Sequence, residues 1–175
     1  MGMSVAGRWA PAKVKVEIMA YKVFISYSTK DIPNVDVLRR FLQFPDVECF
    51  VSEYAVTPGA PLAPAIKNAI LTCDLFVLLW SRNAQASEWV SQEIGIAHGH
   101  QKPILPFVLE QGLSLPGFIK ELRYVAVFQD PQKALYSLRE TVMRNSLMKQ
   151  NQQSLGALAL GGLVLLALVA MSKSS

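Results

Sequence analysis

Glu93 is the acidic residue of this sequence whose surroundings least suit a carboxylate. It lies in the stretch SEWVSQEIGIA, residues 87–97, whose spacing predicts a helix. At about 100° per residue, the apolar side chains of this stretch share one arc of the helix: Trp89, Val90, Ile94, Ile96 and Ala97. Glu93 falls near the centre of that arc. Because an ionised carboxylate facing a core is costly, it is either satisfied by a partner or exposed in a cleft for a chemical purpose.

A single carboxylate in an apolar setting suits the chemistry of glycosidic bonds. It can stabilise an oxocarbenium-like centre, or attack it as the nucleophile of a retaining glycosidase does. Trp89, one turn earlier, offers a flat face for a base or a sugar, although a large aromatic residue is equally suited to anchor a core. A solvated or paired acid without any catalytic role is the alternative for Glu93.

Several other kinds of site are excluded by the motifs that they require. The sequence has no G-x-G-x-x-G after its first predicted strand, no P-loop lysine motif and no G-x-S-x-G. His98 and His100 lack further ligands at fitting spacing, so we expect two surface histidines and no metal. The net charge is +4, without a block of basic residues, so no nucleic-acid partner is expected.

The order of strands and helices predicts the fold. Short runs of β-branched and aromatic residues predict strands at residues 21–28, 47–51, 74–81, 102–109 and 124–128. Segments with helical spacing lie between or after them, at residues 34–44, 65–72, 87–97 and 117–122, and from Pro131 onward. Strands that are almost wholly apolar indicate a parallel sheet covered on both faces. We therefore expect an α/β, flavodoxin-like three-layer sandwich with a five-stranded sheet in the order 2-1-3-4-5, binding ligands at the carboxyl ends of the strands.

A C-terminal run, LGALALGGLVLLALVAM at residues 155–171, has no charged residue and predicts a transmembrane helix. At about 1.5 Å per residue it would span roughly 25 Å, the short end for a bilayer, and a buried core helix is the alternative. Arg139, Arg144 and Lys149 precede the run and Lys173 follows it, which predicts a single-pass membrane protein with a cytoplasmic globular domain.

The expected organisation follows from these segments. Residues 1–19 form a leader without the features of a secretory signal, and residues 20–148 form the globular domain. A juxtamembrane link at residues 149–154 leads to the span at 155–171 and a tail at 172–175. Cys49 and Cys73 form no spacing motif, so two inert thiols in a reducing compartment are expected.

Three stretches together resemble the Toll/interleukin-1 receptor (TIR) domain family. YKVFISYSTKD resembles the first box of that family, AVTPGAPL the loop after its second strand, and DLFVLLWSRNAQASEWVSQEIGIA its third strand and the following helix. The resemblance covers about residues 20–148, with the elements in the right order. It implies the same flavodoxin-like fold.

The resemblance also implies an activity. Many prokaryotic members of the family, and some animal and plant members, cleave NAD at the bond between nicotinamide and ribose. NAD is then the substrate, and no cofactor is needed. The catalytic glutamate of the family lies in a W-V-x-x-E pattern, which this sequence keeps from Trp89 to Glu93. The resemblance therefore implies that Glu93 is the catalytic carboxylate and lines a cleft, with Trp89 beside the substrate.

Further substrate contacts follow from the same resemblance. Tyr27 and Ser28 lie where enzymatic relatives contact the nicotinamide ribose or the phosphates. Some relatives have an arginine at the position of Ser28, and Lys30 could take its role in binding phosphate. Phe50 lies where relatives place an aromatic residue near the nicotinamide, although a plain core role is the alternative.

Self-association is implied as well. The loop that contains Tyr54, Pro58 and Gly59 usually docks onto a neighbouring TIR domain, and active sites in the family are completed across such contacts. A homo-oligomer through TIR–TIR contacts is therefore expected, and attachment to a membrane would raise the effective concentration.

Three functions fit these observations. The first is a membrane-attached NAD glycohydrolase or cyclase in immune or antiphage signalling, which releases linear or cyclic ADP-ribose. The second is a non-enzymatic adaptor or scaffold that recruits other TIR proteins at the membrane through the same loop. The third is a host-directed decoy with this fold, which the sequence does not separate from the second. Turnover that depends on Glu93 distinguishes the first from the others.

Overall fold

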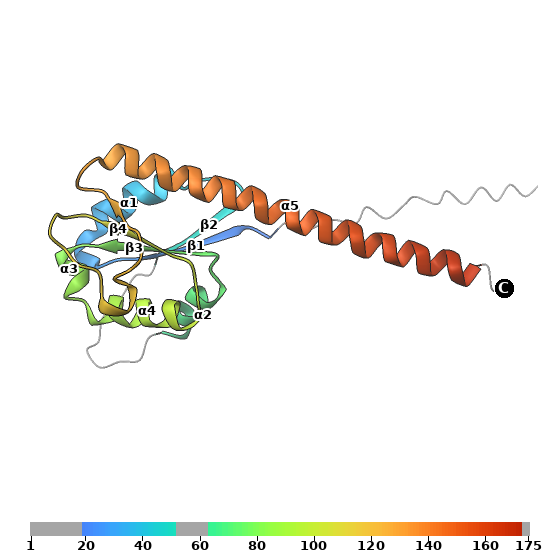
Figure 1. Ribbon diagram of the computed structural model, residues 1–175, viewed down its shortest axis with the longest axis horizontal. Helices are drawn as coiled ribbons and strands as arrows, with labels where there is room; N and C mark the ends of the chain where they lie inside the picture. The colour runs from blue at the N-terminus through green and yellow to red at the C-terminus, as the bar shows by residue number, and fades with distance from the viewer. Residues whose placement is uncertain (1–18, 52–62, 173–175) are drawn as a thin grey trace, which may run out of the picture. The chain divides into compact units, whose positions relative to one another are not determined.

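In the part of the chain that the structure describes, five parallel strands form one sheet in the predicted order, β2-β1-β3-β4-β5 (Figure 1). The strands are β1 (Tyr21–Ser26), β2 (Val47–Val51), β3 (Leu75–Trp80), β4 (Ile104–Val108) and β5 (Val125–Ala126). The α-helices are α1 (Ile32–Phe41), α2 (Pro64–Thr72), α3 (Arg82–Gln85), α4 (Glu88–Gly99) and α5 (Pro131–Ser172), and short 3-10 helices are η1 (Thr29–Asp31) and η2 (Gly117–Ile119).

This computed structural model describes residues 19–51 and 63–172, with the helical backbone alone at residues 157–172. Residues 19–149 form one unit, and residues 150–172 belong to a second. None of the helices in the described ranges is both long enough and apolar enough to cross a membrane. In the predicted span at residues 155–171, the side chains from residue 157 onward are not described. Residues 1–18 of the predicted leader also lie outside the description.

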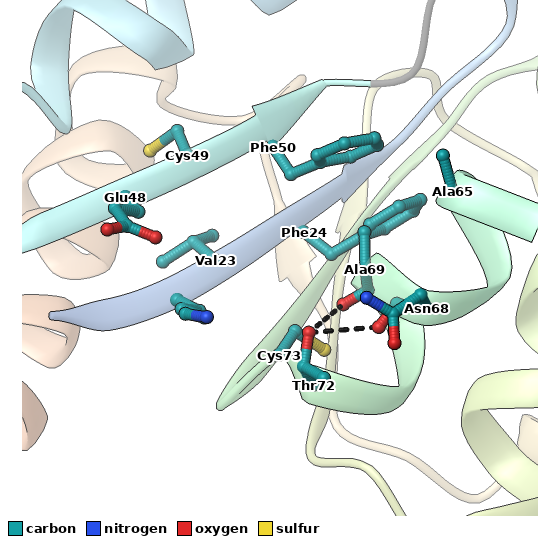
Figure 2. Close-up of a pocket in the computed structure, with 11 residues that line it drawn as sticks. Val23, Phe24, Glu48, Cys49, Phe50, Ala65, Asn68, Ala69, Thr72 and Cys73 are labelled. Carbon is teal, nitrogen blue, oxygen red and sulfur yellow. Dashed lines mark hydrogen bonds between the residues drawn. The ribbon is translucent and has the colours of Figure 1, made fainter. Parts of the chain in front are cut away.

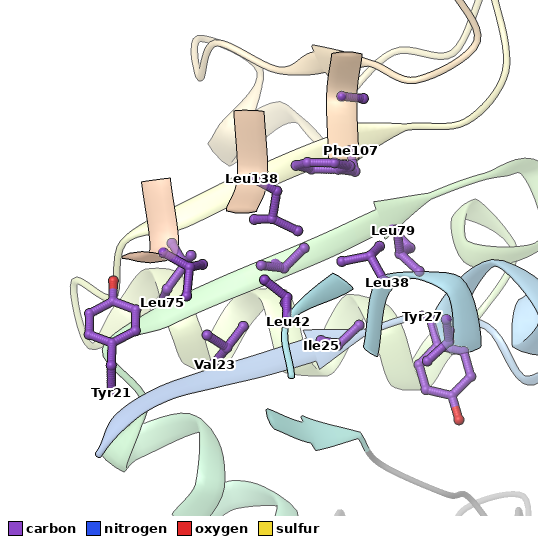
Figure 3. Close-up of a cluster of buried hydrophobic side chains, with 14 residues drawn as sticks. Tyr21, Val23, Ile25, Tyr27, Leu38, Leu42, Leu75, Leu79, Phe107 and Leu138 are labelled. Carbon is purple, nitrogen blue, oxygen red and sulfur yellow. The ribbon is translucent and has the colours of Figure 1, made fainter. Parts of the chain in front are cut away.

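Helices cover both faces of the sheet because side chains alternate along each strand. On one face, strand residues Val23 and Ile25 pack against Leu38 of α1, Leu42 directly after α1, and Leu138 of α5 (Figure 3). On the other face, α2, α3 and α4 cover a second cluster of buried residues, which includes Phe24, Ile70, Phe76, Val90 and Ile94. Strands that are buried on both faces explain why β1 and β3 read as continuous apolar runs in the sequence.

β1 and β3 end earlier than the sequence predicted, because a serine after each strand caps a helical turn instead. β1 stops at Ser26, and the Ser28 side chain accepts a hydrogen bond from the backbone N–H of Lys30 at the start of η1. β3 stops at Trp80, and Ser81 caps α3, a short helix that the sequence analysis did not predict. Both turns therefore bring polar groups to the carboxyl edge of the sheet.

Other boundaries also differ from the prediction. α1 begins at Ile32 rather than residue 34 because proline is tolerated in the first turn of a helix, where Pro33 lies. β5 has two residues instead of the predicted five and pairs with Phe107 and Val108 of β4. Pro106 therefore lies inside β4 but before the β5 ladder begins, where its missing N–H is tolerated.

At the amino edge of the sheet, Asp74 joins three segments of the 19–149 unit. Its carboxylate accepts a hydrogen bond from the backbone N–H of Lys22 at 2.7 Å and pairs with the ammonium group of Lys149 at 2.6 Å. The same ammonium group donates to the carbonyl oxygen of Ala20 at 3.0 Å. Since both charged side chains are about three-quarters covered, this pair is screened less than a surface ion pair.

Replacing Asp74 with alanine should lower the free energy of unfolding by about 1–3 kcal/mol, because two donors lose a partly buried charged acceptor. The measurement is urea denaturation of the detergent-solubilised full chain, followed by tryptophan fluorescence. Asp36→Ala serves as the control, because Asp36 is exposed on α1 and its change should stay within about 0.5 kcal/mol. Equal losses in the two variants would contradict the assigned contribution of Asp74.

Candidate active site

The helix that carries Glu93 is fixed to the sheet by its apolar side. Ser87 caps α4, because its side-chain oxygen accepts the backbone N–H of Val90 at 3.4 Å. Val90, Ile94 and Ala97 are fully buried in the cluster on the face of the sheet that α2, α3 and α4 cover. Glu93 lies among them with an exposed fraction of 0%. The prediction that Glu93 faces the apolar side of its helix is therefore confirmed.

The Glu93 carboxylate accepts a hydrogen bond from a hydroxyl group at the end of β1. Ser26, the last residue of β1, donates from Oγ to Oε2 of Glu93 at 2.6 Å, and both side chains are fully buried. This distance lies within the normal range for an O–H···O hydrogen bond. Glu93 was expected to line a cleft, and the structure shows its side chain fully buried and bonded to Ser26.

The Ser26–Glu93 pair lies at the carboxyl end of β1, an inner strand of the sheet. β1 pairs with β2 on one side and with β3 on the other, so the strand order reverses between β1 and β3. Ser26 lies at the carboxyl end of β1, at that reversal. Ligands of open α/β sheets bind outside the carboxyl ends of the strands at such a switch point. Glu93 is thus held at the edge of the sheet where this fold class binds ligands.

A second polar cluster at the same edge was missed by the sequence analysis. Asp31, which is 6% exposed, accepts hydrogen bonds from Ser81 Oγ at 2.5 Å and from Asn83 Nδ2 at 2.8 Å. The sequence analysis gave Asp31 no role of its own. The signal that could have found the cluster is the pair of polar runs that directly follow two neighbouring strands, residues 28–31 and 81–83.

The predicted substrate-binding residues are not all brought to Glu93. Tyr27 is buried in the cluster on the α1 and α5 face, opposite to Ser26 (Figure 3). Ser28 is buried and caps η1, whereas Lys30 is exposed at the same turn. Trp89 is half-buried on α4, one turn before Glu93. The turn after β1 therefore contributes a capping serine and an exposed lysine, and the tyrosine contributes to the core.

Phe50 lies in a separate hollow of about 480 Å³, between the edge strand β2 and helix α2 (Figure 2). Its ring stacks on Phe24 at 5.4 Å between centroids, and Phe24 stacks on Phe76 at 5.3 Å. Ala65 and other residues of α2 line the opposite wall, and Glu93 is not among the lining residues. Phe50 is 39% exposed, so it is not a fully buried core residue.

The two thiols near this hollow are poor nucleophiles at neutral pH. Burial raises the pKa of Cys49 to about 11, although the positive charge of Arg39 lowers it slightly. Burial likewise raises the pKa of Cys73 to about 11. Both thiols are therefore protonated at pH 7, and a cysteine nucleophile is not expected in this part of the molecule.

The two histidines lie exposed at the end of α4. The ring of His98 contacts the ring of Phe118 at 5.5 Å, and Nδ1 of His100 lies 3.0 Å from the carbonyl oxygen of Ile96. Within the described residues, no group of three histidine, cysteine or acidic side chains could hold a metal ion.

The predicted self-association residues Tyr54, Pro58 and Gly59 lie outside the described residues.

Known proteins share this architecture. A family model for the TIR domain matches residues 23–140. The chain is 20% identical to the TIR domain of the Toll-related receptor TRR-2 from Hydra magnipapillata, with a TM-score of 0.53 over 73% of this chain and 98% of that one. It is 19% identical to a prokaryotic SEFIR domain, with a TM-score of 0.53 over 70% and 99% of the two chains. At these identities the two structures show a shared fold. No curated protein matches the sequence.

Replacing Ser26 with alanine should lower the free energy of unfolding by about 1–3 kcal/mol, because it removes the hydroxyl that donates to a buried carboxylate. Denaturation of the full chain in urea measures the change. Ser91→Ala is the matched control, because Ser91 lies on the exposed side of α4 and should change stability by less than about 0.5 kcal/mol. An unchanged midpoint for Ser26→Ala would show that this hydrogen bond does not stabilise the fold.

Proposed function

The chain belongs to the TIR domain family, and from that premise we propose that it cleaves NAD at the bond between nicotinamide and ribose. The observation that carries the proposal is the carboxylate of Glu93, held at the switch point of the sheet within a W-V-x-x-E pattern. The products are nicotinamide and ADP-ribose, in linear or cyclic form. NAD is the substrate, and the reaction needs no cofactor.

The proposed reaction requires little from the protein beyond one negative charge close to the ribose. When the carbon–nitrogen bond breaks, its electron pair leaves with nicotinamide, which becomes neutral, and positive charge develops on the ribose. A carboxylate beside that carbon stabilises the charge or adds to it covalently. Water, or a nucleophile from the same substrate, then forms the new bond to the ribose. In this scheme Ser26 orients the carboxylate, and Trp89 offers a flat surface at the same end of α4.

The burial of Glu93 sets a condition on this activity. Because its exposed fraction is 0%, NAD reaches the carboxylate only after neighbouring groups have moved. Binding energy from substrate or from a second copy of the chain can shift a protein toward such a minor open state. We therefore expect activity per molecule to rise with protein concentration, in keeping with a homo-oligomer formed through TIR–TIR contacts.

The same burial favours one alternative function. The Glu93 carboxylate is fully covered and bonded to Ser26. In this alternative, its one role is to pack α4 against β1. The domain would then act as a non-enzymatic adaptor or scaffold that recruits other TIR proteins. Assembly without turnover of NAD is the result that would select this alternative.

Replacing Glu93 with glutamine should reduce nicotinamide release at least ~100-fold, because the charge that stabilises the ribose is lost. The amide keeps an oxygen that can accept from Ser26, so the fold should persist. The assay incubates the detergent-solubilised full chain with NAD over a range of protein concentrations and separates the products. Glu88→Gln is the matched control, since Glu88 is an exposed acid in the first turn of the same helix.

Two results would decide against the enzymatic proposal. Activity that is undiminished in Glu93→Gln would reject Glu93 as the catalytic carboxylate. Absence of nicotinamide release from the assembled wild-type chain, at concentrations where it self-associates, would leave the adaptor function instead.

The proposal includes a membrane-attached protein in immune or antiphage signalling, with its TIR domain in the cytoplasm. Support comes from the sequence of residues 155–171, which lacks charged residues and follows Arg139, Arg144 and Lys149. Attachment in a membrane confines the domains to a surface and raises their effective concentration. This arrangement suits a site whose opening depends on self-association.

Membrane attachment predicts that the chain pellets with membranes and resists extraction by alkaline carbonate. A variant that combines Leu160→Arg and Leu166→Arg should be released, because each arginine near the centre of a span costs roughly 2.5–3.5 kcal/mol on insertion scales. Release of the unaltered chain by carbonate would show that residues 155–171 do not cross the bilayer.

A further inference from the structure

Asp31 is a buried carboxylate at the carboxyl edge of the sheet that the reaction itself does not use. It lies at the end of η1, directly before α1, and 6% of its surface is exposed. Its two oxygens accept from different residues of one neighbouring turn, Oδ2 from Ser81 and Oδ1 from Asn83. Asp31 therefore ties the turn after β1 to the turn after β3, across the switch point.

The bonds continue from this turn to the helix that carries Glu93. Ser81 Oγ accepts the backbone N–H of Ala84 at 3.0 Å, which caps α3. The carbonyl oxygen of Ala84 accepts the backbone N–H of Ser87 at 3.1 Å. The side chain of Ser87 in turn caps α4 through the N–H of Val90. Asp31 is thus connected, through α3, to the first turn of α4.

These connections form a closed ring. From Ser26 the chain runs to Asp31 through a turn in which the N–H of Asp31 donates to the carbonyl oxygen of Ser28 at 2.7 Å. From Asp31 the bonds run through α3 to α4, and Glu93 of α4 returns to Ser26. In such a ring, each link restricts the others. Removing Asp31 breaks this ring between the turn after β1 and the turn after β3.

We propose that Asp31 is a positioning residue, which holds α3 and the start of α4 so that the Glu93 carboxylate keeps its place at the switch point. This role rests on the proposed cleavage of NAD, because it concerns the carboxylate that the cleavage uses. A displacement of about 1 Å in a catalytic group can reduce a rate about 100-fold, so such a restraint has a measurable effect.

The test compares Asp31→Ala, Asp31→Asn and Asp74→Ala in the full, detergent-solubilised chain. Asp31→Ala should lower kcat for NAD cleavage at least ~10-fold and change KM less than ~3-fold, because the geometry of the carboxylate is disturbed rather than substrate binding. Asp31→Asn should restore most of kcat. Its amide oxygen can still accept from Asn83, and its amide nitrogen can donate to Ser81 Oγ, which has a second lone pair.

Asp74→Ala is the matched control, because Asp74 is also a bonded aspartate but lies at the amino edge of the sheet. It should destabilise the fold and leave kcat unchanged. A loss of kcat in Asp74→Ala that equals the loss in Asp31→Ala would show a general effect of stability and overturn the proposal. Failure of Asp31→Asn to recover activity beyond Asp31→Ala would also overturn it.

A second readout separates this inference from the proposed function. Hydrogen exchange of the backbone amides of Ala84 and Val90 should accelerate in Asp31→Ala and stay near the wild-type rate in Asp31→Asn, whether or not NAD is cleaved. If the wild-type chain cleaves no NAD, the proposed function fails, and exchange still tests the ring. Unchanged exchange at both amides in Asp31→Ala would show that Asp31 does not hold α3 and α4.

Discussion

The hydrogen bond between Ser26 and Glu93 is the interaction on which the carboxyl edge of this sheet depends. A carboxylate inside an apolar layer costs several kcal/mol unless its oxygens accept hydrogen bonds. Ser26 supplies one donor from the end of β1, at a distance of 2.6 Å. A leucine in place of Glu93 would satisfy the same helix face without any partner. The retained acid is therefore an exception to the packing pattern of α4, and such exceptions are expected at functional sites.

Two aspartates make polar contacts at opposite edges of the sheet. Asp74, at the amino edge, joins β1, β3 and the helix α5 within the 19–149 unit. Asp31, at the carboxyl edge, joins the turns after β1 and β3. The apolar strands between them contribute stability that is not specific to either edge. The chemistry of the domain can thus change at the carboxyl edge while the amino edge keeps the strands and α5 together.

The alternation of predicted strands and helices was sufficient for the fold class and its sheet order, and helical periodicity was sufficient for the side of α4 on which Glu93 lies. It was not sufficient for the partner of Glu93, because Ser26 lies 67 positions away and the pairing depends on three-dimensional packing. Helix α3, with four residues, is too short to show a helical period, so the cluster around Asp31 was missed. The substrate contact expected of Phe50 stays a prediction, because the structure shows only that its ring lines the hollow between β2 and α2.

The stacked rings of Phe50, Phe24 and Phe76 have a consequence for the alignment of the strands. They lie directly opposite one another in the pairings of β1 with β2 and β3. A slip of β2 by one residue would turn Phe50 to the other face of the sheet and place Cys49 or Val51 opposite Phe24. Each ring pair contributes about 0.5–1.5 kcal/mol beyond its buried area, so the aligned rings disfavour such a slip. Three phenylalanines thereby fix the alignment of β1 with both of its neighbours, and with it the height at which its terminal hydroxyl meets the helix.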